Sequence, residues 1–276
     1  MKKIQYTVLT ILITWIFNQK LMAQGYNKVF VFAQGDTYET EVTTNSDAIV
    51  KRGNQQFKIK SKTVLTKKYL VQSVNGEKVD VQVNIDKLLC NLDVNGKKVN
   101  YDSSQKAENT SSIVNGIAYI VHKPIVVSLN KYGAIQAAEE YKAEMATDTL
   151  LAFAGIQSEV FTQSRIMSFL ADFSYRQGLR AGHAWTDNGS QDGESSTVRF
   201  VVDDVNEQST ILRFTSKVTT PLVNTNSTGT YVLDNATGMI KEKYIYTISI
   251  GYQFSAGNIT YAVSRATNRV EKTRKL

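Results

Sequence analysis

The sequence is poor in three residue types that many functional sites require. Its 276 residues include one cysteine, two prolines and two histidines. A single cysteine excludes an intrachain disulfide framework and any zinc site built from several thiolates. The histidines, His122 and His183, lie 61 residues apart and are a poor basis for a metal site. We therefore expect no metal ion and no cofactor.

The N-terminal segment is typical of a secretory signal peptide. Lys2 and Lys3 precede an apolar run over residues 8–17, and Ala23 supplies a small residue at the expected cut before Gln24. Ten apolar residues are too few to cross a hydrocarbon layer of about 30 Å. Cleavage removes three lysines and no acidic residue, so the net charge falls from +7 to +4. We expect a soluble periplasmic or secreted protein, without stable membrane insertion and without nucleic-acid binding.

Alternation of apolar and polar residues dominates the remaining sequence. It is clearest over residues 79–86, 198–203, 212–218 and 244–254. Strands of this kind have one dry and one wet face, which is typical of antiparallel sheets. With so few prolines, little interrupts the strands.

A local repeat indicates hairpins. Val-Asn-Gly begins at residues 74, 94 and 114, and Asn-Gly favours the positive φ angles of a tight β-turn. A period of 20 residues has room for two short strands and a second turn. The repeat predicts a meander over about residues 57–129, with its Asn-Gly turns along one edge.

The middle of the chain departs from this pattern. Between Ile156 and Phe173 the apolar residues recur at helical spacing, and residues 134–146 are rich in Ala and Glu. A long antiparallel sheet must bury its apolar face, and central helices are the expected cover.

These patterns predict an α+β fold in a single domain over residues 24–276, preceded by the signal peptide at residues 1–23. The expected architecture is a large curved antiparallel sheet, a half-barrel, with central helices packed on its concave face. The expected segments are strands over 26–130, a helical segment over 134–177, strands over 183–264 and a solvated basic tail over 265–276.

An aromatic row in the last predicted strands has two interpretations. It is either a core face against the helices or a lining for a hydrophobic ligand, for which tyrosine offers an apolar ring and a polar hydroxyl. The residues that we expect to line such a ligand site are Tyr244, Tyr246, Tyr252, Phe254, Met167, Phe169 and Phe173.

Signals for catalysis are weak, and we expect no catalytic residues. No Gly-x-Ser-x-Gly elbow is present, and a hydrolase would have to use His183 with an acid such as Asp187. Cys90 lies in an apolar run and is interpreted as a small buried hydrophobe. The acidic stretch 187–194 departs from a calcium-binding loop at three of its positions.

Several short motifs carry a resemblance. They are Phe32–Tyr38 (Phe-Ala-Gln-Gly-Asp-Thr-Tyr), Gly182–Trp185 (Gly-His-Ala-Trp) and Gly229–Gly238 (Gly-Thr-Tyr-Val-Leu-Asp-Asn-Ala-Thr-Gly). With the signal peptide, they resemble a family of uncharacterised secreted proteins of Gram-negative bacteria. The order of strands, helices and strands is similar to the LolA/LppX lipoprotein-carrier half-barrel, which implies binding of lipid or of a lipoprotein chain. The residues that match the recurring positions of the family are interpreted as turn and packing residues: Gly182, Trp185, Asp234 and Gly238.

The leading hypothesis is a non-catalytic cell-envelope protein that binds a lipid, an acyl chain or another hydrophobic ligand in a concave sheet. The alternatives are an outer-membrane β-barrel and an envelope scaffold with a protein partner, followed by a hydrolase.

Overall fold

The computed structural model describes residues 29–105, 118, 121, 123–138, 156, 161, 163–171, 179–191, 193–255 and 259–276. Within these ranges every element of secondary structure is a β-strand, and all pairings are antiparallel in one 12-stranded sheet. The strands are β1 (Thr37–Arg52), β2 (Gln55–Asn75), β3 (Lys78–Val94), β4 (Lys97–Asp102), β5 (Ile125–Asn130), β6 (Ile135–Ala138), β7 (Ala184–Gln191), β8 (Glu194–Val205), β9 (Ser209–Thr219), β10 (Val223–Asp234), β11 (Ile240–Ser255) and β12 (Ile259–Lys275). The signal peptide, His122 and Phe173 lie outside the described residues.

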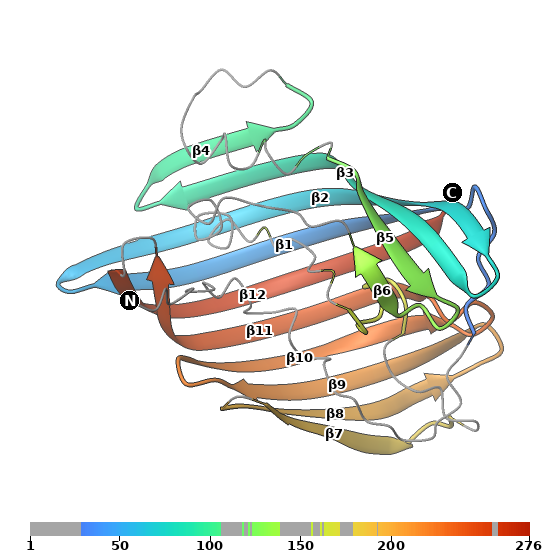
Figure 1. Cartoon of the computed structure of the whole chain (residues 1–276). Coiled ribbons are helices and arrows are strands. Elements are labelled where there is room, and N and C mark those ends of the chain that lie inside the picture. Colours follow the sequence, from blue (N-terminus) through green and yellow to red (C-terminus); the bar gives the residue numbers. More distant parts are fainter. Residues whose placement is uncertain are drawn as a thin grey trace, which may run out of the picture.

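The two ends of the described chain meet in the middle of the sheet. The strand order is β6-β5-β3-β2-β1-β12-β11-β10-β9-β8-β7, with β4 paired to β3 off this path. Strands β1 and β12 run side by side from Tyr38, opposite Lys275, to Lys51, opposite Ala262. One meander extends from β1 and the other from β12, as Figure 1 shows. The long strand β3 pairs through its first half with β5 and through its second half with β4.

The prediction of an α+β fold with central helices on the concave face is wrong. The described part of the predicted helical segment contains strand β6 and a crossing segment, residues 163–171, which is made of turns and isolated bridges. Met167, Phe169 and Leu170 are buried there, so the segment does cover the sheet. Most of its backbone hydrogen bonds are to other segments, at Gly133, Ile135, Gly238 and Ile240, and not within a helix. Apolar spacing alone does not distinguish these two ways of covering a sheet.

The prediction of a solvated basic tail is also wrong. Residues 265–275 belong to β12, which pairs with β1 on one side and with β11 on the other. The basic side chains divide between the two faces of this strand, and most have acidic partners. Arg269 pairs with Glu271 of its own strand, Arg274 with Glu39 of β1, and Lys275 with Asp36.

The Asn-Gly turns form, but not along one edge. A two-residue loop at Gly76 and Glu77 joins β2 to β3, and Asn95 and Gly96 join β3 to β4 with φ angles of 53° and 87°. Strand β3 has 17 residues, so one 20-residue repeat contains a single long strand instead of the two short strands expected. The two turns therefore lie at opposite ends of β3. The third Val-Asn-Gly lies outside the described residues.

The sheet has a covered face, whose side chains are mostly buried, and an open face, whose side chains are mostly exposed. Most apolar core residues lie on the covered face, in three clusters. On β11 the expected assignment is reversed. Thr247 and Ser249 are buried on the covered face, whereas the aromatic and aliphatic row from Tyr244 to Tyr252 lies on the open face.

Candidate functional site

A row of six hydroxyl side chains crosses the covered face in the middle of the sheet. Each member stands opposite the next in the strand register, from β2 through β1, β12, β11 and β10 to β9. All six are buried, and neighbouring strands lie about 4.8 Å apart, so the row is roughly 24 Å long. The hydroxyl row consists of Ser61, Ser46, Thr267, Thr247, Ser227 and Ser216.

The hydroxyl row is bonded within itself but not at its ends. Ser227 and Thr247 share a hydrogen bond of 2.9 Å, and Thr267 donates to Ser46 at 3.3 Å. The terminal hydroxyls, on Ser61 and Ser216, are buried and have no hydrogen-bond partner among the described residues. An unsatisfied buried polar group costs about 1–3 kcal/mol. The two ends of the row are therefore positions where a polar ligand atom would be stabilised.

A cluster of charged side chains lies beside the hydroxyl row on the same face. Glu271 of β12 forms ion pairs with Arg269 and with Lys243 of β11, with 2.7 Å from its carboxylate to Arg269 Nε and 3.3 Å to Lys243 Nζ. The positive charge of Lys67 on β2 also lowers the pKa of this carboxylate. Lys67 and Glu271 are among the most buried charged residues, at 4% and 6% exposure. These four residues are named the Glu271 cluster.

The Glu271 cluster holds its carboxylate ionised. Burial raises the pKa of Glu271, but the charges of Arg269, Lys243 and Lys67 outweigh burial and lower this pKa to about 2. Three cations therefore surround one anion at neutral pH. Such a set of buried donors is suited to a second anionic group, because charge-assisted hydrogen bonds are the strongest that a protein offers.

The crossing segment bonds directly to the Glu271 cluster. Lys243 donates through Nζ to the backbone oxygen of Ser168, and the Ser168 hydroxyl lies 3.2 Å from the hydroxyl of Tyr69. At one end, Ile135 of β6 donates its N–H to the oxygen of Arg165. The segment thus ties β6 to the centre of the sheet across the covered face.

Aromatic side chains flank the Glu271 cluster on both sides. On the β2 side, Phe169 lies 5.1 Å from Tyr38 and 4.7 Å from Tyr69, measured between ring centroids. On the other side, a ladder of rings runs from the edge strand β7 to β10 and ends where Lys243 Nζ lies 6.0 Å from the Tyr231 ring. The ladder consists of Trp185, Phe200, Phe214 and Tyr231. The covered face is therefore apolar on either side of a polar centre.

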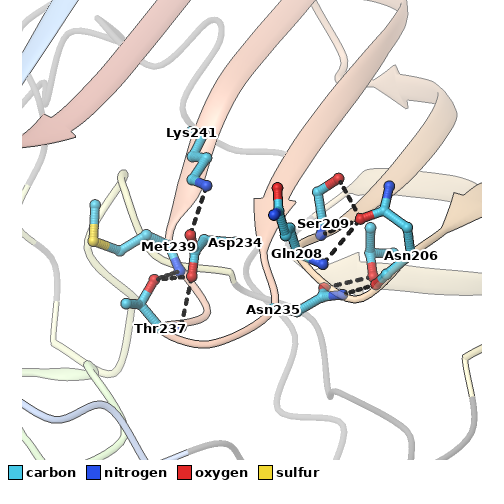
Figure 2. Close-up of polar contacts among 9 residues, drawn as sticks. Asn206, Gln208, Ser209, Asp234, Asn235, Thr237, Met239 and Lys241 are labelled. Atoms are coloured by element: carbon cyan, nitrogen blue, oxygen red, sulfur yellow. Dashed lines mark hydrogen bonds and ion pairs between the residues drawn. The ribbon is translucent and has the colours of Figure 1, made fainter.

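The turn between β10 and β11 holds the other end of the crossing segment, and Figure 2 shows its polar contacts. Asp234 accepts the N–H and the hydroxyl of Thr237 at 2.8 and 2.9 Å and pairs with Lys241 at 2.7 Å. Gly238 completes the turn with a φ of 78°, and its oxygen accepts the N–H of Ala171. The predicted turn roles of Asp234 and Gly238 are confirmed.

A second turn braces the first one. In Figure 2, Asn206 accepts the N–H groups of Gln208 and Ser209 at 2.9 and 2.8 Å. Asn235 donates through its side-chain amide to the backbone oxygen of Asn206 at 2.7 Å, and it accepts the Thr210 hydroxyl at 2.7 Å. The loops β8–β9 and β10–β11 are thereby joined beside the C-terminal end of the crossing segment.

Acid is expected to weaken this turn. Burial raises the pKa of Asp234, but Lys241 and the groups of Thr237 lower it further, to about 2, from an ordinary 3.8. A depressed pKa stabilises the fold above pH 4, and this contribution disappears as the pH falls toward 2. Asp234→Asn should lower the free energy of unfolding by about 1–2 kcal/mol at pH 7, after allowance for partial solvent screening. Urea unfolding at pH 7 and pH 2.5 measures this. A loss of the same size at pH 2.5 would contradict a stabilising role of the ionised Asp234 carboxylate. An equal loss in Asp204→Asn, on the open face, would contradict it as well.

The structure separates the predicted ligand-lining residues into two groups. Met167 and Phe169 lie on the covered face, and both are about 1% exposed. Tyr244, Tyr246 and Tyr252 lie on the open face of β11. Phe254 is in the same strand, and Phe173 lies outside the described residues. The five members whose side chains the structure describes therefore lie on opposite faces of the sheet.

The other candidate residues also have defined places. His183 and Asp187 are four residues apart along an extended segment, which separates them by roughly 13 Å, too far for a hydrogen bond. Trp185 packs on Phe200, and Gly182 occupies a turn with a φ of 84°, as their interpretation as packing and turn residues required. Cys90 is buried, and burial raises the pKa of its thiol although the Thr63 hydrogen bond opposes this. The prediction of a small buried hydrophobe is confirmed.

Sequence reasoning missed the hydroxyl row and the Glu271 cluster. Pairs of hydroxyl residues spaced by one residue were visible at Thr44 and Ser46, at Ser61 and Thr63, at Thr225 and Ser227, and at Thr247 and Ser249. Their alignment depends on the strand register, which joins residues more than 200 positions apart. The repeated occurrence of such hydroxyl pairs in several predicted strands was the signal in the sequence that could have indicated the row.

Two further observations concern the described residues alone. No group of three or more His, Cys, Asp and Glu side chains is placed to hold a metal ion. In these ranges no helix has the length and hydropathy that crossing a membrane requires.

Comparisons with known proteins find similarity at the level of fold. No family model matches the chain, and no curated protein matches it. It is similar to a solved structure of lipovitellin that concerns lipid–protein interactions, with a TM-score of 0.50 and 9% identity over 88% of this chain. The match covers 26% of the lipovitellin chain, so this sequence spans about a quarter of its length.

Outer-membrane proteins of bacteria follow at lower similarity. An outer membrane channel from Pseudomonas putida F1 has a TM-score of 0.26 and 7% identity over 90% of this chain and 98% of its own. OccK7 (OpdD) from Pseudomonas aeruginosa has a TM-score of 0.25 and 7% identity over 88% of this chain and 100% of its own. Scores this low carry no argument. The comparison with lipovitellin shows a related sheet architecture and nothing more.

Proposed function

We propose that this chain is a non-catalytic cell-envelope protein that binds an amphipathic lipid on the covered face of its sheet. The observation that carries the proposal is the arrangement of that face: a buried polar centre with three cations lies between two apolar, largely aromatic regions. An anionic headgroup would bind at the Glu271 cluster and the hydroxyl row. Acyl chains would lie along the aromatic side chains on either side.

The chemistry of the face favours an amphiphile over a purely apolar ligand. Ligand sites are mostly apolar with a few convergent polar groups that orient the ligand. An acyl chain offers no acceptor to a buried hydroxyl, whereas the oxygens of a headgroup would satisfy the terminal hydroxyl beside which it binds. The sheet architecture shared with lipovitellin supports lipid as the ligand class.

Location in the envelope is part of the same proposal. It is supported by the predicted signal peptide and by the resemblance to secreted proteins of Gram-negative bacteria. A role inside the bilayer is less favourable, because the open face carries exposed charges in its central strands, among them Asp47 of β1 and Lys60 of β2. A lysine or arginine that faces lipid costs about 2–4 kcal/mol near the bilayer midplane.

Ligand capture provides the test. The protein is purified without detergent, extracted with organic solvent and analysed by mass spectrometry, and its affinity for a fluorescent phosphatidic acid is then titrated. We expect a copurifying amphiphile and saturable binding of the probe. A protein that carries no lipid and does not bind the probe would overturn the proposal.

Variants at the ends of the hydroxyl row sharpen this test. Ser61→Ala with Ser216→Ala removes two unsatisfied hydroxyls, so the free energy of unfolding of the empty protein should rise by about 1–3 kcal/mol per site. Affinity for the probe should fall by about 2- to 12-fold, which corresponds to about 0.5–1.5 kcal/mol for the one hydrogen bond lost to the headgroup. A gain in stability together with a loss of affinity would indicate that these hydroxyls bind the ligand. The control is Ser264→Ala, an exposed serine of β12 on the open face, which should change neither quantity.

A further inference from the structure

A second apolar surface lies on the opposite, open face of the sheet. Five large side chains of β11 point outward at alternate positions, with exposures of 38–58%. Side chains two residues apart on a strand are neighbours about 6.6 Å apart, so the five form one continuous stripe roughly 26 Å long. The open stripe consists of Tyr244, Tyr246, Ile248, Ile250 and Tyr252.

The stripe widens across β12 toward β1. Small residues of β12, Ala266 and Ala262, stand opposite Ile248 and Tyr252 in the register. Ile49 of β1, which is 41% exposed, stands opposite Ser264, the register partner of Ile250. Exposed apolar areas that extend over several strands are uncommon on soluble proteins and mark interaction surfaces.

Basic side chains border the stripe on both sides. On β2, Lys58, Lys60 and Lys62 are exposed and lie in the same cross-strand rows as Ile250, Ile248 and Tyr246, with β1 and β12 between. On the far side, Lys217 of β9 and Arg199 of β8 are exposed on the same face.

Few acidic groups oppose these five cations. Asp47 lies 4.0 Å from Lys60, and Glu242 accepts the hydroxyl of Tyr244 at the end of the stripe. The other residues that lie between these cations and the open stripe in the cross-strand rows are mostly neutral. Asn45, Asn226 and Asn268 are among them. The bordered surface therefore has a net positive charge.

We infer that the open face docks on the surface of an anionic lipid bilayer, with the open stripe inserted into the headgroup region. Tyrosine suits this region because its ring is apolar and its hydroxyl remains hydrated. Each lysine near an anionic membrane surface strengthens binding about 5-fold. A second copy of the chain is a poor occupant, since two basic faces repel each other. The inference concerns the face opposite the ligand site and stands independently of it.

Flotation with vesicles tests the docking. The full chain is mixed with vesicles of phosphatidylcholine alone or with one quarter phosphatidylglycerol. We expect binding to the anionic vesicles, little binding to the neutral ones, and release by high salt. Equal binding to both vesicle types, or binding to neither, would overturn the inference.

Two pairs of variants locate the contact. Ile248→Thr with Ile250→Thr should weaken vesicle binding at least 10-fold, whereas Val31→Thr, at a position 88% exposed outside the stripe, should not. Lys58→Gln with Lys62→Gln should weaken it roughly 30-fold, and Lys97→Gln with Lys98→Gln, two exposed lysines of β4, should have a much smaller effect. Equal losses for the two lysine pairs would mean attraction by net charge alone. Equal losses for the isoleucine and valine variants would mean that the open stripe makes no specific contact, and either result would overturn the inference. Thermal unfolding of each variant confirms the fold, and a dimer that dissociates in the isoleucine variant would identify a second copy as the occupant instead.

Discussion

Replacement of Glu271 by glutamine is expected to lower the free energy of unfolding by about 3–5 kcal/mol, the usual cost of removing one partner from a buried ion cluster. The carboxylate lies 2.7 Å from Arg269 Nε and 3.3 Å from Lys243 Nζ, and all three side chains are at most 17% exposed. Glutamine retains the shape but leaves the buried cations without their counter-charge. Urea unfolding at pH 7 measures the loss.

The pH dependence separates charge from packing at this position. The pKa of Glu271 is about 2, well below its ordinary 4.5. Its ionisation therefore stabilises the fold above pH 4.5, and this contribution disappears as the pH falls toward 2. The difference between the wild type and Glu271→Gln should shrink over the same range. Glu41→Gln, at an exposed position on β1, is the control and should cost less than 0.5 kcal/mol. A constant difference at every pH would contradict the electrostatic account.

The second large loss of stability is expected at Gly133, whose backbone oxygen accepts the N–H of Met167 in the crossing segment. Gly133 has a φ of 75°, and a Cβ placed there would lie 2.4 Å from Leu170 Cδ1 and 3.1 Å from the ring of Phe30. Gly133→Ala combines a left-handed backbone, which costs about 1–2 kcal/mol, with overpacking of about 1–3 kcal/mol. We expect a loss of about 2–4 kcal/mol in the free energy of unfolding.

A matched glycine isolates the steric part. Gly35 has a similar φ of 88°, but a Cβ there meets nothing within 4 Å. Gly35→Ala should therefore show the backbone cost alone, about 1–2 kcal/mol. The difference between the two variants measures how tightly the crossing segment packs. Equal losses would mean that Leu170 moves aside freely and that the segment does not seal the covered face.

Local patterns in the sequence were sufficient for the strands and for several turns. Alternation marked the antiparallel strands, and Asn95 with Gly96 adopt the positive φ angles that a tight hairpin requires. The roles of Trp185 in packing and of Gly238 in a turn also follow from local chemistry. These features depend on neighbours within a few residues, which is why the sequence displays them.

Local patterns did not determine which face of each strand is covered. A period of two residues defines two faces of a strand without stating which one is covered. On β11 the apolar row was assigned to the interior, but Thr247 and Ser249 are covered because their register neighbours are also hydroxyls, Thr267, Ser227 and Thr225. Likewise, the helical spacing around Met167 indicated burial but not conformation. Both features are set by contacts distant in sequence.

Photo-crosslinking tests the central claim most directly. A phosphatidic acid with a diazirine in its acyl chain is bound to the full chain, irradiated, and located by mass spectrometry of peptides. We expect labels on covered-face residues such as Phe214 and Tyr231, suppressed by excess unlabelled lipid. Labels confined to the outward side chains of β11, or labelling that excess lipid does not suppress, would contradict a ligand on the covered face.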